Sequence, residues 1–187
     1  MTIAGSLTPT TFWFLRHGET NWNIDSLAQG NVDIPLNQTG LAQARTSAEK
    51  LRNRGIRTIV SSPLSRARDT AHIVAEALGL PVEFDDGLRE VAFGVNEGKP
   101  IADQWFIDWL DGVATPEGAE SFASLRARAA EAINRVVAKT APVLVVAHGG
   151  FFRALRADMG LQPNVRLPNG TPYFCEPGDP WVLSEAR

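Results

Sequence analysis

Two short apolar runs, each followed closely by a histidine, most constrain the fold of this chain. Residues 12–15 (FWFL) precede Arg16 and His17, and residues 143–147 (VLVVA) precede His148. Four or five consecutive apolar residues are typical of a strand covered on both faces, as in a parallel sheet. The carboxyl ends of such strands are where open α/β folds bind ligands. We therefore expect both histidines near one ligand-binding edge of a sheet.

The rest of the chain alternates between strand and helix patterns. After a loose leader at 1–10, we expect strands at 12–16, 58–60, 81–84, 143–147, 171–175 and 181–183, and helices at 39–54, 63–78, 102–110, 121–139 and 151–159. The first loop should extend to about Asn37, and Gly55 and Gly79 should follow the ends of two helices. This alternation predicts an α/β fold, with a largely parallel sheet and helices on both faces.

Length and composition indicate one globular domain. The chain has 187 residues, of which 44% are hydrophobic and 21% are charged. Its net charge of -3 argues against a nucleic-acid partner but allows a small cationic pocket. The single cysteine, Cys175, excludes an intramolecular disulfide and fits a reducing compartment. Residues 1–11 lack a signal-peptide pattern, and no apolar run approaches the roughly 20 residues that span a bilayer. We expect a cytoplasmic protein with no membrane partner.

Arginines accompany the two histidines. Arg16 directly precedes His17, and Arg66 follows residues 61–63 (SSP) at the start of a predicted helix. Guanidinium groups bind phosphate oxygens bidentately, and a helix N-terminus near 63–66 would add backbone N–H donors. A neutral imidazole within such a site can attack phosphorus and form a covalent phosphoenzyme. The pattern therefore predicts a phosphate site that contains a nucleophilic histidine.

Several of these residues also have an ordinary structural interpretation. A lone histidine at a strand end is usually only a hydrogen-bonded residue, and it is the pairing that favours a site. Glu90 is a candidate general acid for a leaving alkoxide, with Glu19 and Glu97 as rivals, yet alone it fits a surface carboxylate. Asn23 could donate to a phosphate oxygen or cap a turn. His72 fits a structural residue inside a helix.

The aromatic side chains suggest where a substrate could lie, and motifs for other kinds of nucleophile are absent. Five aromatic residues could wall a substrate mouth or pack a core: Trp22, Phe93, Trp105, Phe106 and Trp109. The chain has no Gly-x-Ser-x-Gly elbow and no Gly-x-x-x-x-Gly-Lys-Ser/Thr loop. Cys175 has Trp181, not an arginine, six positions later, so a cysteine-phosphatase loop is excluded. Zinc-type spacing of histidines or cysteines is absent, and we expect no metal.

Several short motifs occur together over about residues 12–155. They are 15–20 (LRHGET), 22–23 (WN), Gly30, 33–36 (DIPL), 62–67 (SPLSRA), 70–71 (TA), Glu90, 93–94 (FG), 97–98 (EG) and 145–150 (VVAHGG). In these segments and in their order, the chain resembles the histidine phosphatase superfamily, in its cofactor-dependent phosphoglycerate mutase-like branch. The resemblance implies a three-layer α/β/α sandwich with a mostly parallel central sheet. It also implies a single domain over 1–187, with a small cap at about 85–120.

The resemblance assigns roles to the site residues. His17 is the nucleophile that becomes phosphohistidine, and Glu90 donates a proton to the leaving group before activating water. The phosphoryl group is bound by Arg16, Arg66 and His148. Substrate binding is further expected from Asn23, Gly149, Thr20 and Gly30. No metal and no cofactor is implied.

Three functions are compatible with these residues. The first is a phosphomonoesterase acting on a small phosphorylated metabolite, and the second is a phosphoglycerate mutase. The third, a non-catalytic phosphate-binding protein, is disfavoured because all the catalytic residues are intact. Only 25 residues separate Glu90 from Pro116. The related mutases carry a longer insertion here that helps exclude water, so the short segment favours hydrolysis. We expect a monomer or a homodimer, because the terminal strands could pair across a two-fold axis or complete the sheet.

Overall fold

A six-stranded sheet forms the centre of the computed structural model, which describes residues 6–187; the first five residues of the predicted leader lie outside this range. The strands are β1 (Phe12–Arg16), β2 (Thr58–Ser61), β3 (Val82–Phe84), β4 (Val143–Ala147), β5 (Pro172–Glu176) and β6 (Val182–Glu185). Their order is β3-β2-β4-β1-β5-β6. The first four of these are parallel, whereas β5 and β6 are antiparallel additions at one edge. The terminal strands therefore complete the sheet of their own chain.

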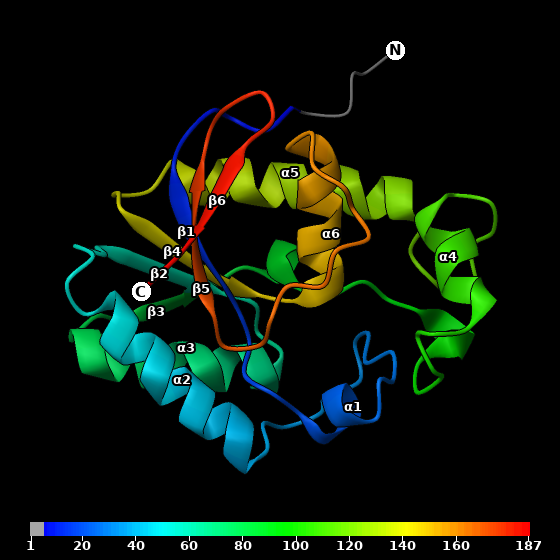
Figure 1. Ribbon diagram of the computed structural model, residues 1–187, viewed down its shortest axis with the longest axis horizontal. Helices are drawn as coiled ribbons and strands as arrows, with labels where there is room; N and C mark the ends of the chain where they lie inside the picture. The colour runs from blue at the N-terminus through cyan, green and yellow to red at the C-terminus, as the bar shows by residue number, and fades with distance from the viewer. Residues whose placement is uncertain (1–5) are drawn as a thin grey trace.

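Helices cover both faces of this sheet. Helices α2 (Gln38–Leu51) and α3 (Ser65–Leu78) lie on one face, and α5 (Phe122–Val137) and α6 (Gly149–Asp158) lie on the other (Figure 1). The connections hold α1 (Asn21–Ile24), α4 (Gln104–Leu110) and the 3-10 turns η1 (Asp86–Leu88) and η2 (Gly94–Asn96). This arrangement confirms the expected three-layer α/β/α sandwich. Of the helices in residues 6–187, none combines the length and apolar character needed to cross a membrane.

Alternation along the buried strands divides the core into two halves. All five residues of β1 are buried, as are those of β4. In β1, Phe12 and Phe14 belong to the cluster that includes α5 and α6, whereas Trp13 and Leu15 belong to the cluster that includes α2 and α3. Successive side chains of a strand point to opposite faces, so a strand covered on both faces must be apolar throughout. This requirement explains the continuous run that identified β1.

The structure corrects several expected boundaries. Helix α2 ends at Leu51 rather than near residue 54, and Gly55, with φ of 67°, lies in the turn beyond the Arg52 cap. Helix α3 begins at Ser65, not at Pro63. Helix α1 was not expected, because the stretch up to Asn37 has loop composition. Its four residues are too few for an apolar period to appear.

Candidate active site

The predicted site residues meet at the carboxyl edge of three adjacent strands. Arg16 ends β1 and is followed by His17, while His148 follows β4, which lies between β1 and β2. Arg66 lies in the first turn of α3, which follows β2. The centroids of the His17 and His148 rings are 5.3 Å apart. The parallel order of the strands thus brings residues 132 positions apart in the chain into one site.

His17 is held as a neutral imidazole. Its ring is buried, and Nδ1 lies 2.7 Å from the carbonyl oxygen of Gly18. A carbonyl only accepts hydrogen bonds, so Nδ1 carries the proton and Nε2 keeps its lone pair. Burial, together with the charges of Arg66 and Arg16, lowers the pKa of His17 well below 6.5. An unprotonated Nε2 is the form that can attack phosphorus.

Two arginines are fixed by backbone carbonyls around this ring. Arg16 Nη1 donates to the carbonyl of Leu167 at 2.6 Å. Arg66 donates through Nη1 to Val32 at 2.9 Å and through Nη2 to Gly30 at 2.7 Å. Burial and neighbouring cations, Arg166 foremost, lower the pKa of Arg16 to about 9, and burial lowers the pKa of Arg66 to about 10. Both guanidinium groups therefore remain charged at neutral pH. Gly30, expected in substrate binding, here holds Arg66 through its carbonyl.

Buried donors without acceptors surround His17. Within residues 6–187, no hydrogen-bond partner is present for Arg16 Nε, Arg66 Nε or His148 Nδ1, although all three atoms are buried. Buried polar groups in proteins are almost always paired. Three unpaired nitrogen atoms, two of them on cations, therefore indicate a site shaped for an anion.

His148 can act as a donor from its Nδ1 side. Its Nε2 lies 2.7 Å from Ser62 Oγ, which itself accepts from the backbone N–H of Leu64. The Ser62 hydroxyl proton is then free to point to Nε2, which leaves the ring proton on Nδ1. Burial, reinforced by Arg66, His17 and Arg16, lowers the pKa of His148 well below 6.5. A neutral His148 can therefore donate Nδ1–H to a bound anion.

Asn23 presents its amide nitrogen to the cavity. Its Oδ1 accepts from the backbone N–H and the hydroxyl of Thr20, at 3.1 and 3.2 Å, and from Asn169 Nδ2 at 3.1 Å. With its oxygen engaged, Asn23 Nδ2 is left as the donor toward the cavity that the residue lines. Thr20, expected in substrate binding, caps α1 behind Asn23. Asn169 also donates to the carbonyl of His17 at 3.0 Å, and no sequence motif pointed to it.

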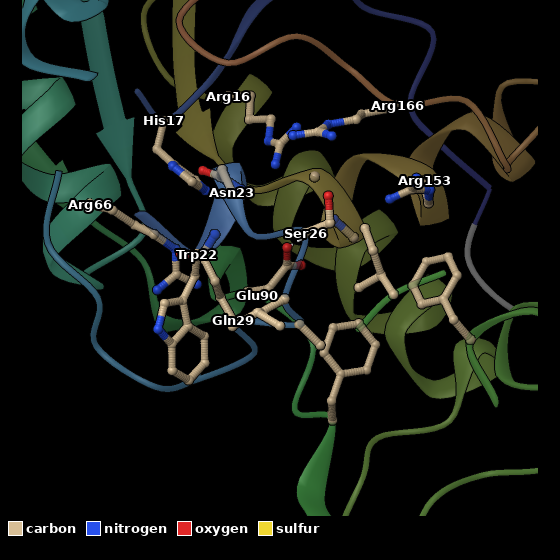
Figure 2. Close-up of a pocket in the computed structure, with 17 residues that line it drawn as sticks. Arg16, His17, Trp22, Asn23, Ser26, Gln29, Arg66, Glu90, Arg153 and Arg166 are labelled. Atoms are coloured by element: carbon tan, nitrogen blue, oxygen red, sulfur yellow. Dashed lines mark hydrogen bonds between the residues drawn. The ribbon is translucent and has the colours of Figure 1, made fainter. Parts of the chain in front are cut away.

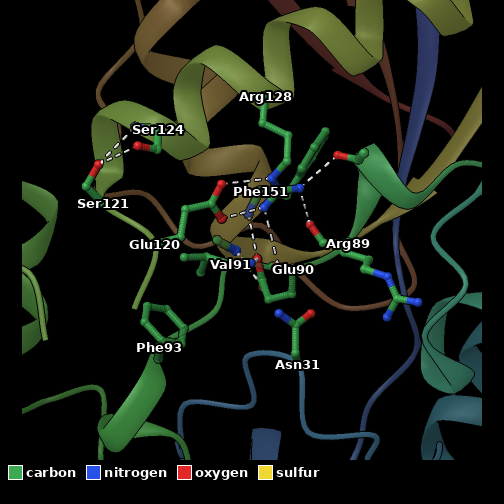
Figure 3. Close-up of polar contacts among 12 residues, drawn as sticks. Asn31, Arg89, Glu90, Val91, Phe93, Glu120, Ser121, Ser124, Arg128 and Phe151 are labelled. Atoms are coloured by element: carbon green, nitrogen blue, oxygen red, sulfur yellow. Dashed lines mark hydrogen bonds and ion pairs between the residues drawn. The ribbon is translucent and has the colours of Figure 1, made fainter. Parts of the chain in front are cut away.

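Glu90 caps the N-terminus of α6 at the cavity wall. Its Oε2 accepts from Gly150 N at 2.9 Å, and its Oε1 accepts from Phe151 N at 2.8 Å and Val91 N at 3.0 Å (Figure 3). A Cβ at position 150 would lie 2.7 Å from Glu90 Oε1, so only glycine allows this approach. Gly149 lines the same cavity as the first residue of α6. The carboxylate is thereby fixed in position near His17.

The rival carboxylates are engaged elsewhere. Glu19 accepts from Asn37 Nδ2 at 3.0 Å, and Glu97 accepts from Asn31 N at 2.9 Å. Glu90 alone among the three lines the cavity. This placement favours Glu90 for proton transfer to and from a ligand bound there.

The helix N-terminus at the site belongs to α6 rather than to α3. We expected backbone donors near residues 63–66, but Ser65 N donates to Asp33 Oδ1 at 2.8 Å and Leu64 N donates to Ser62 Oγ at 3.3 Å. At Leu64 and Ser65 that expectation is wrong, because both donors already have acceptors; Gly150 N and Phe151 N at the start of α6 donate to Glu90. The strand that precedes α6 ends closer to the centre of the sheet, next to β1.

Arg128 on α5 clamps the segment that carries Glu90 (Figure 3). Its Nη1 donates to the carbonyls of Gly87 and Arg89 at 2.8 and 2.9 Å. Its Nε and Nη2 form a bidentate pair with Glu120, at 2.8 and 2.6 Å. The guanidinium thus joins both ends of the 87–120 segment to the sandwich. Arg128 is a positioning residue, since it reaches the site only through this segment.

Replacing Arg128 should displace Glu90. We expect Arg128→Met to reduce turnover of alkyl phosphates about tenfold or more, and to lower the free energy of unfolding by about 1–3 kcal/mol, the usual cost of losing charge-assisted hydrogen bonds. The loss should be smaller for p-nitrophenyl phosphate, whose leaving group needs little protonation. Arg126→Met is the matched control, because Arg126 also lies on α5 but pairs with Asp158 on α6. Equal losses on both esters would assign Arg128 a purely structural role.

Charged and aromatic side chains together line the cavity, and Glu90 lies between His17 on one side and Arg153 on the other (Figure 2). The cavity volume of about 50 Å³ accommodates a few water-sized atoms, which suits a phosphoryl group. Of the five aromatic candidates, Trp22, Phe93 and Phe106 line it, whereas Trp109 is fully buried in the core and Trp105 donates to the carbonyl of Pro100. Lining residues that were not predicted from the sequence include the polar side chains of Ser26, Gln29, Arg153 and Arg166. Across residues 6–187, no three His, Cys, Asp or Glu side chains form a group that could hold a metal ion.

The two neutral histidines make stability depend on pH. In the unfolded chain both would bind protons below about pH 6.5, but burial depresses both pKa values in the folded protein. Protons then favour the unfolded state, so the free energy of unfolding falls as pH drops below about 6.5. The slope should reach about 1.4 kcal/mol per pH unit for each histidine. Urea denaturation between pH 7 and pH 5, in buffer without phosphate, measures it. The His17→Gln/His148→Gln variant should have a flatter profile, and an equal slope would contradict the assignment.

Fold and site together define an α/β protein with a cationic cavity around a buried histidine. The family model of the histidine phosphatase superfamily (branch 1) matches residues 12–169. The chain belongs to the histidine phosphatase superfamily. It is 38% identical over 148 residues to the probable phosphoglycerate mutase GpmB of Yersinia pestis, which covers 73% of this chain and 68% of that protein.

Solved structures of similar shape include two phosphatases. The mycobacterial glucosyl-3-phosphoglycerate phosphatase in complex with VO3 has a TM-score of 0.82 at 32% identity, over 94% of this chain and 97% of that one. A histidine-to-alanine variant of phosphoserine phosphatase from Entamoeba histolytica, in complex with phosphoserine, has a TM-score of 0.81 at 25% identity, over 95% and 96%. Both a phosphatase and a mutase function fit these similarities.

Proposed function

We propose that this protein is a phosphomonoesterase that acts through a phosphohistidine at His17. The observation that carries the proposal is the neutral, buried His17 ring beside arginine nitrogens that have no acceptor in the described residues. Guanidinium groups stabilise the charge of the phosphoryl oxygens, while a fixed imidazole supplies the nucleophile in line. The substrate is a small phosphorylated metabolite, because the cavity has a volume of only about 50 Å³.

The reaction proceeds in two displacements. In the first, Nε2 of His17 forms a bond to phosphorus as the ester P–O bond breaks, and Glu90 gives its proton to the leaving oxygen. Arg16, Arg66 and His148 hold the phosphoryl oxygens, assisted by Asn23. In the second, Glu90 takes a proton from water as the water oxygen attacks phosphorus and the N–P bond breaks. Phosphate leaves, and His17 returns to its neutral form.

Hydrolysis is favoured over phosphoryl transfer to a second hydroxyl. The chain matches the named phosphatase structures over nearly their whole length, but it covers only 68% of the named mutase. We propose that the segment at about 85–120 forms a small cap on a single domain. A short cap leaves the phosphoenzyme open to water. A phosphoglycerate mutase is the second candidate, supported by the GpmB relative.

An assay of phosphate release separates these two functions. The purified protein would be incubated, without added metal, with a panel of phosphomonoesters, and in parallel with 3-phosphoglycerate and 2,3-bisphosphoglycerate. Rapid phosphate release is the expected result. Isomerisation of phosphoglycerate that depends on the bisphosphate, without released phosphate, would identify a mutase instead. If neither activity occurs, phosphate binding without catalysis becomes the function to pursue.

We also propose a cellular location and an assembly state for this activity. A cytoplasmic location is supported by the single cysteine, Cys175, which is free and buried. Neither a nucleic acid nor a membrane is proposed as a partner. The assembly is a monomer or a homodimer, which sedimentation would distinguish.

A further inference from the structure

The reactivity of His17 depends on the direction of one peptide group, the one that joins Gly18 to Glu19. Its carbonyl oxygen lies 2.7 Å from His17 Nδ1 and so keeps the ring proton on that nitrogen. If this peptide turned over, its N–H would face Nδ1 in place of the carbonyl. Nδ1 would then accept, and the proton would move to Nε2, the atom that must attack phosphorus. A reactive ring therefore requires this peptide to keep its direction.

The backbone at Gly18 does not fix that direction by itself. A Cβ at this position would lie 2.3 Å from the carbonyl oxygen of Gly40, so only glycine lets the turn pack against the start of α2. Glycine also tolerates many backbone conformations, because it has no Cβ. The residue that allows the close approach thus removes the steric barrier to peptide rotation. Hydrogen bonds must supply what the side chain does not.

Gln43 on α2 makes the hydrogen bond that holds this peptide. The N–H of Glu19 donates to Gln43 Oε1 at 2.8 Å. The N–H and C=O of one trans peptide point in opposite directions, so this bond directs the Gly18 carbonyl toward His17. Thr70 Oγ1 holds the preceding peptide, because it accepts from Gly18 N at 3.0 Å. Gln43 is half-buried and is not among the described residues that line the cavity.

We propose that Gln43 is a positioning residue, which holds the peptide between Gly18 and Glu19 and thereby keeps the lone pair of His17 on Nε2. This inference rests on the proposed function for the role of His17 as nucleophile, and it adds a residue of α2 outside the cavity. A side-chain oxygen suits the task, because it can only accept from the Glu19 N–H. Loss of that oxygen would leave the peptide free to turn, and a fraction of the rings would then be unreactive.

The tautomer of His17 can be measured directly by nitrogen-15 NMR, because protonated and unprotonated ring nitrogens differ widely in chemical shift. The signals of His17 are those missing from His17→Asn. The wild-type ring should be protonated at Nδ1 only, whereas Gln43→Met should move part of the population to the Nε2–H form. Gln43→Glu should keep the wild-type pattern, since a carboxylate still accepts from Glu19 N. Gln38→Met is the matched control, because Gln38 is exposed on the same helix.

Kinetics should separate this role from a general disturbance of the site. Gln43→Met should lower kcat for p-nitrophenyl phosphate about 5- to 50-fold, the effect of losing one buried hydrogen bond and of populating an unreactive state. The inhibition constant of inorganic phosphate should rise by no more than about twofold, because Arg16 and Arg66 are untouched. Gln43→Glu should restore most of the activity. A general disturbance would instead weaken phosphate binding together with kcat.

The NMR measurement also separates this inference from the proposed function. A tautomer shift in Gln43→Met supports the inference even if the protein releases phosphate from no ester, in which case the proposed function alone fails. Gln43→Lys, which offers only donors, is a second variant and should shift the tautomer further. A His17 tautomer that stays unchanged in a folded Met or Lys variant overturns the inference, whatever happens to kcat. A wild-type ring protonated at Nε2 overturns it without any variant.

Discussion

His17→Ala should reduce phosphate release by at least about 10³-fold, because it removes the atom that bonds to phosphorus. Removal of an essential nucleophile commonly costs this much or more, and the residual rate comes from binding alone. The other neutral imidazole of the site, His148, cannot replace it, because its Nε2 is engaged with Ser62 Oγ and its Nδ1 carries the proton. Initial rates with p-nitrophenyl phosphate measure the loss, since this ester has a good leaving group and isolates the nucleophilic step.

The control for this prediction is another histidine of the same chain. His72 lies exposed on α3, with its ring 5.8 Å from that of Phe84, and takes no part in the site. His72→Ala should keep full activity. Because His17 is buried, His17→Asn provides a second variant with smaller loss of packing, and circular dichroism verifies that both are folded. A folded His17 variant that retains most of its activity would contradict a covalent mechanism at this residue.

Glu90→Gln should separate substrates by their leaving groups. General acid catalysis contributes about 10²- to 10⁴-fold where a poor leaving group must be protonated. We therefore expect a loss of that size with alkyl phosphates and a much smaller loss with p-nitrophenyl phosphate. The measured quantity is the ratio of kcat/KM for the two esters, before and after substitution.

The ratio of kcat/KM for the two esters distinguishes loss of proton transfer from a general distortion of the site. Glu90 accepts three backbone N–H groups, and a glutamine amide cannot accept from all of them, so some local distortion is expected. Distortion slows both esters to the same extent and leaves the ratio unchanged. Glu19→Gln, at a carboxylate outside the cavity, should leave the ratio at its wild-type value. An unchanged ratio in Glu90→Gln would move the acid role to another residue.

The central part of the site could be predicted from the sequence because it follows from strand patterns. Arg16, His17 and His148 come at or just after the ends of continuous apolar runs, and parallel strands bring their carboxyl ends to one edge. Arg66 could be placed with them through its position in the first turn after β2. Helical and strand periodicity likewise predicted the layers of the fold, with errors of a few residues at the ends.

The outer part of the site depends on contacts between distant segments. Asn169 orients Asn23 across 146 positions of the chain, and no local motif records such a contact. Arg153 follows the helical pattern of α6, so nothing in the sequence separated it from an ordinary surface arginine. Arg166 lies in a connection without periodicity. Glu90 was one of three candidate acids until the resemblance selected it, because its position depends on the α6 amides and on Arg128.

The most direct test of the account is to trap the phosphoenzyme. The protein would be mixed with an excess of p-nitrophenyl phosphate, quenched in alkali within milliseconds, digested and analysed by mass spectrometry, since phosphohistidine survives alkali. A covalent mechanism at His17 predicts one added phosphoryl group on this residue, formed in a burst equal to the enzyme concentration and absent in His17→Ala. Rapid phosphate release with no label on His17 at any quench time would contradict the account and indicate direct attack by water.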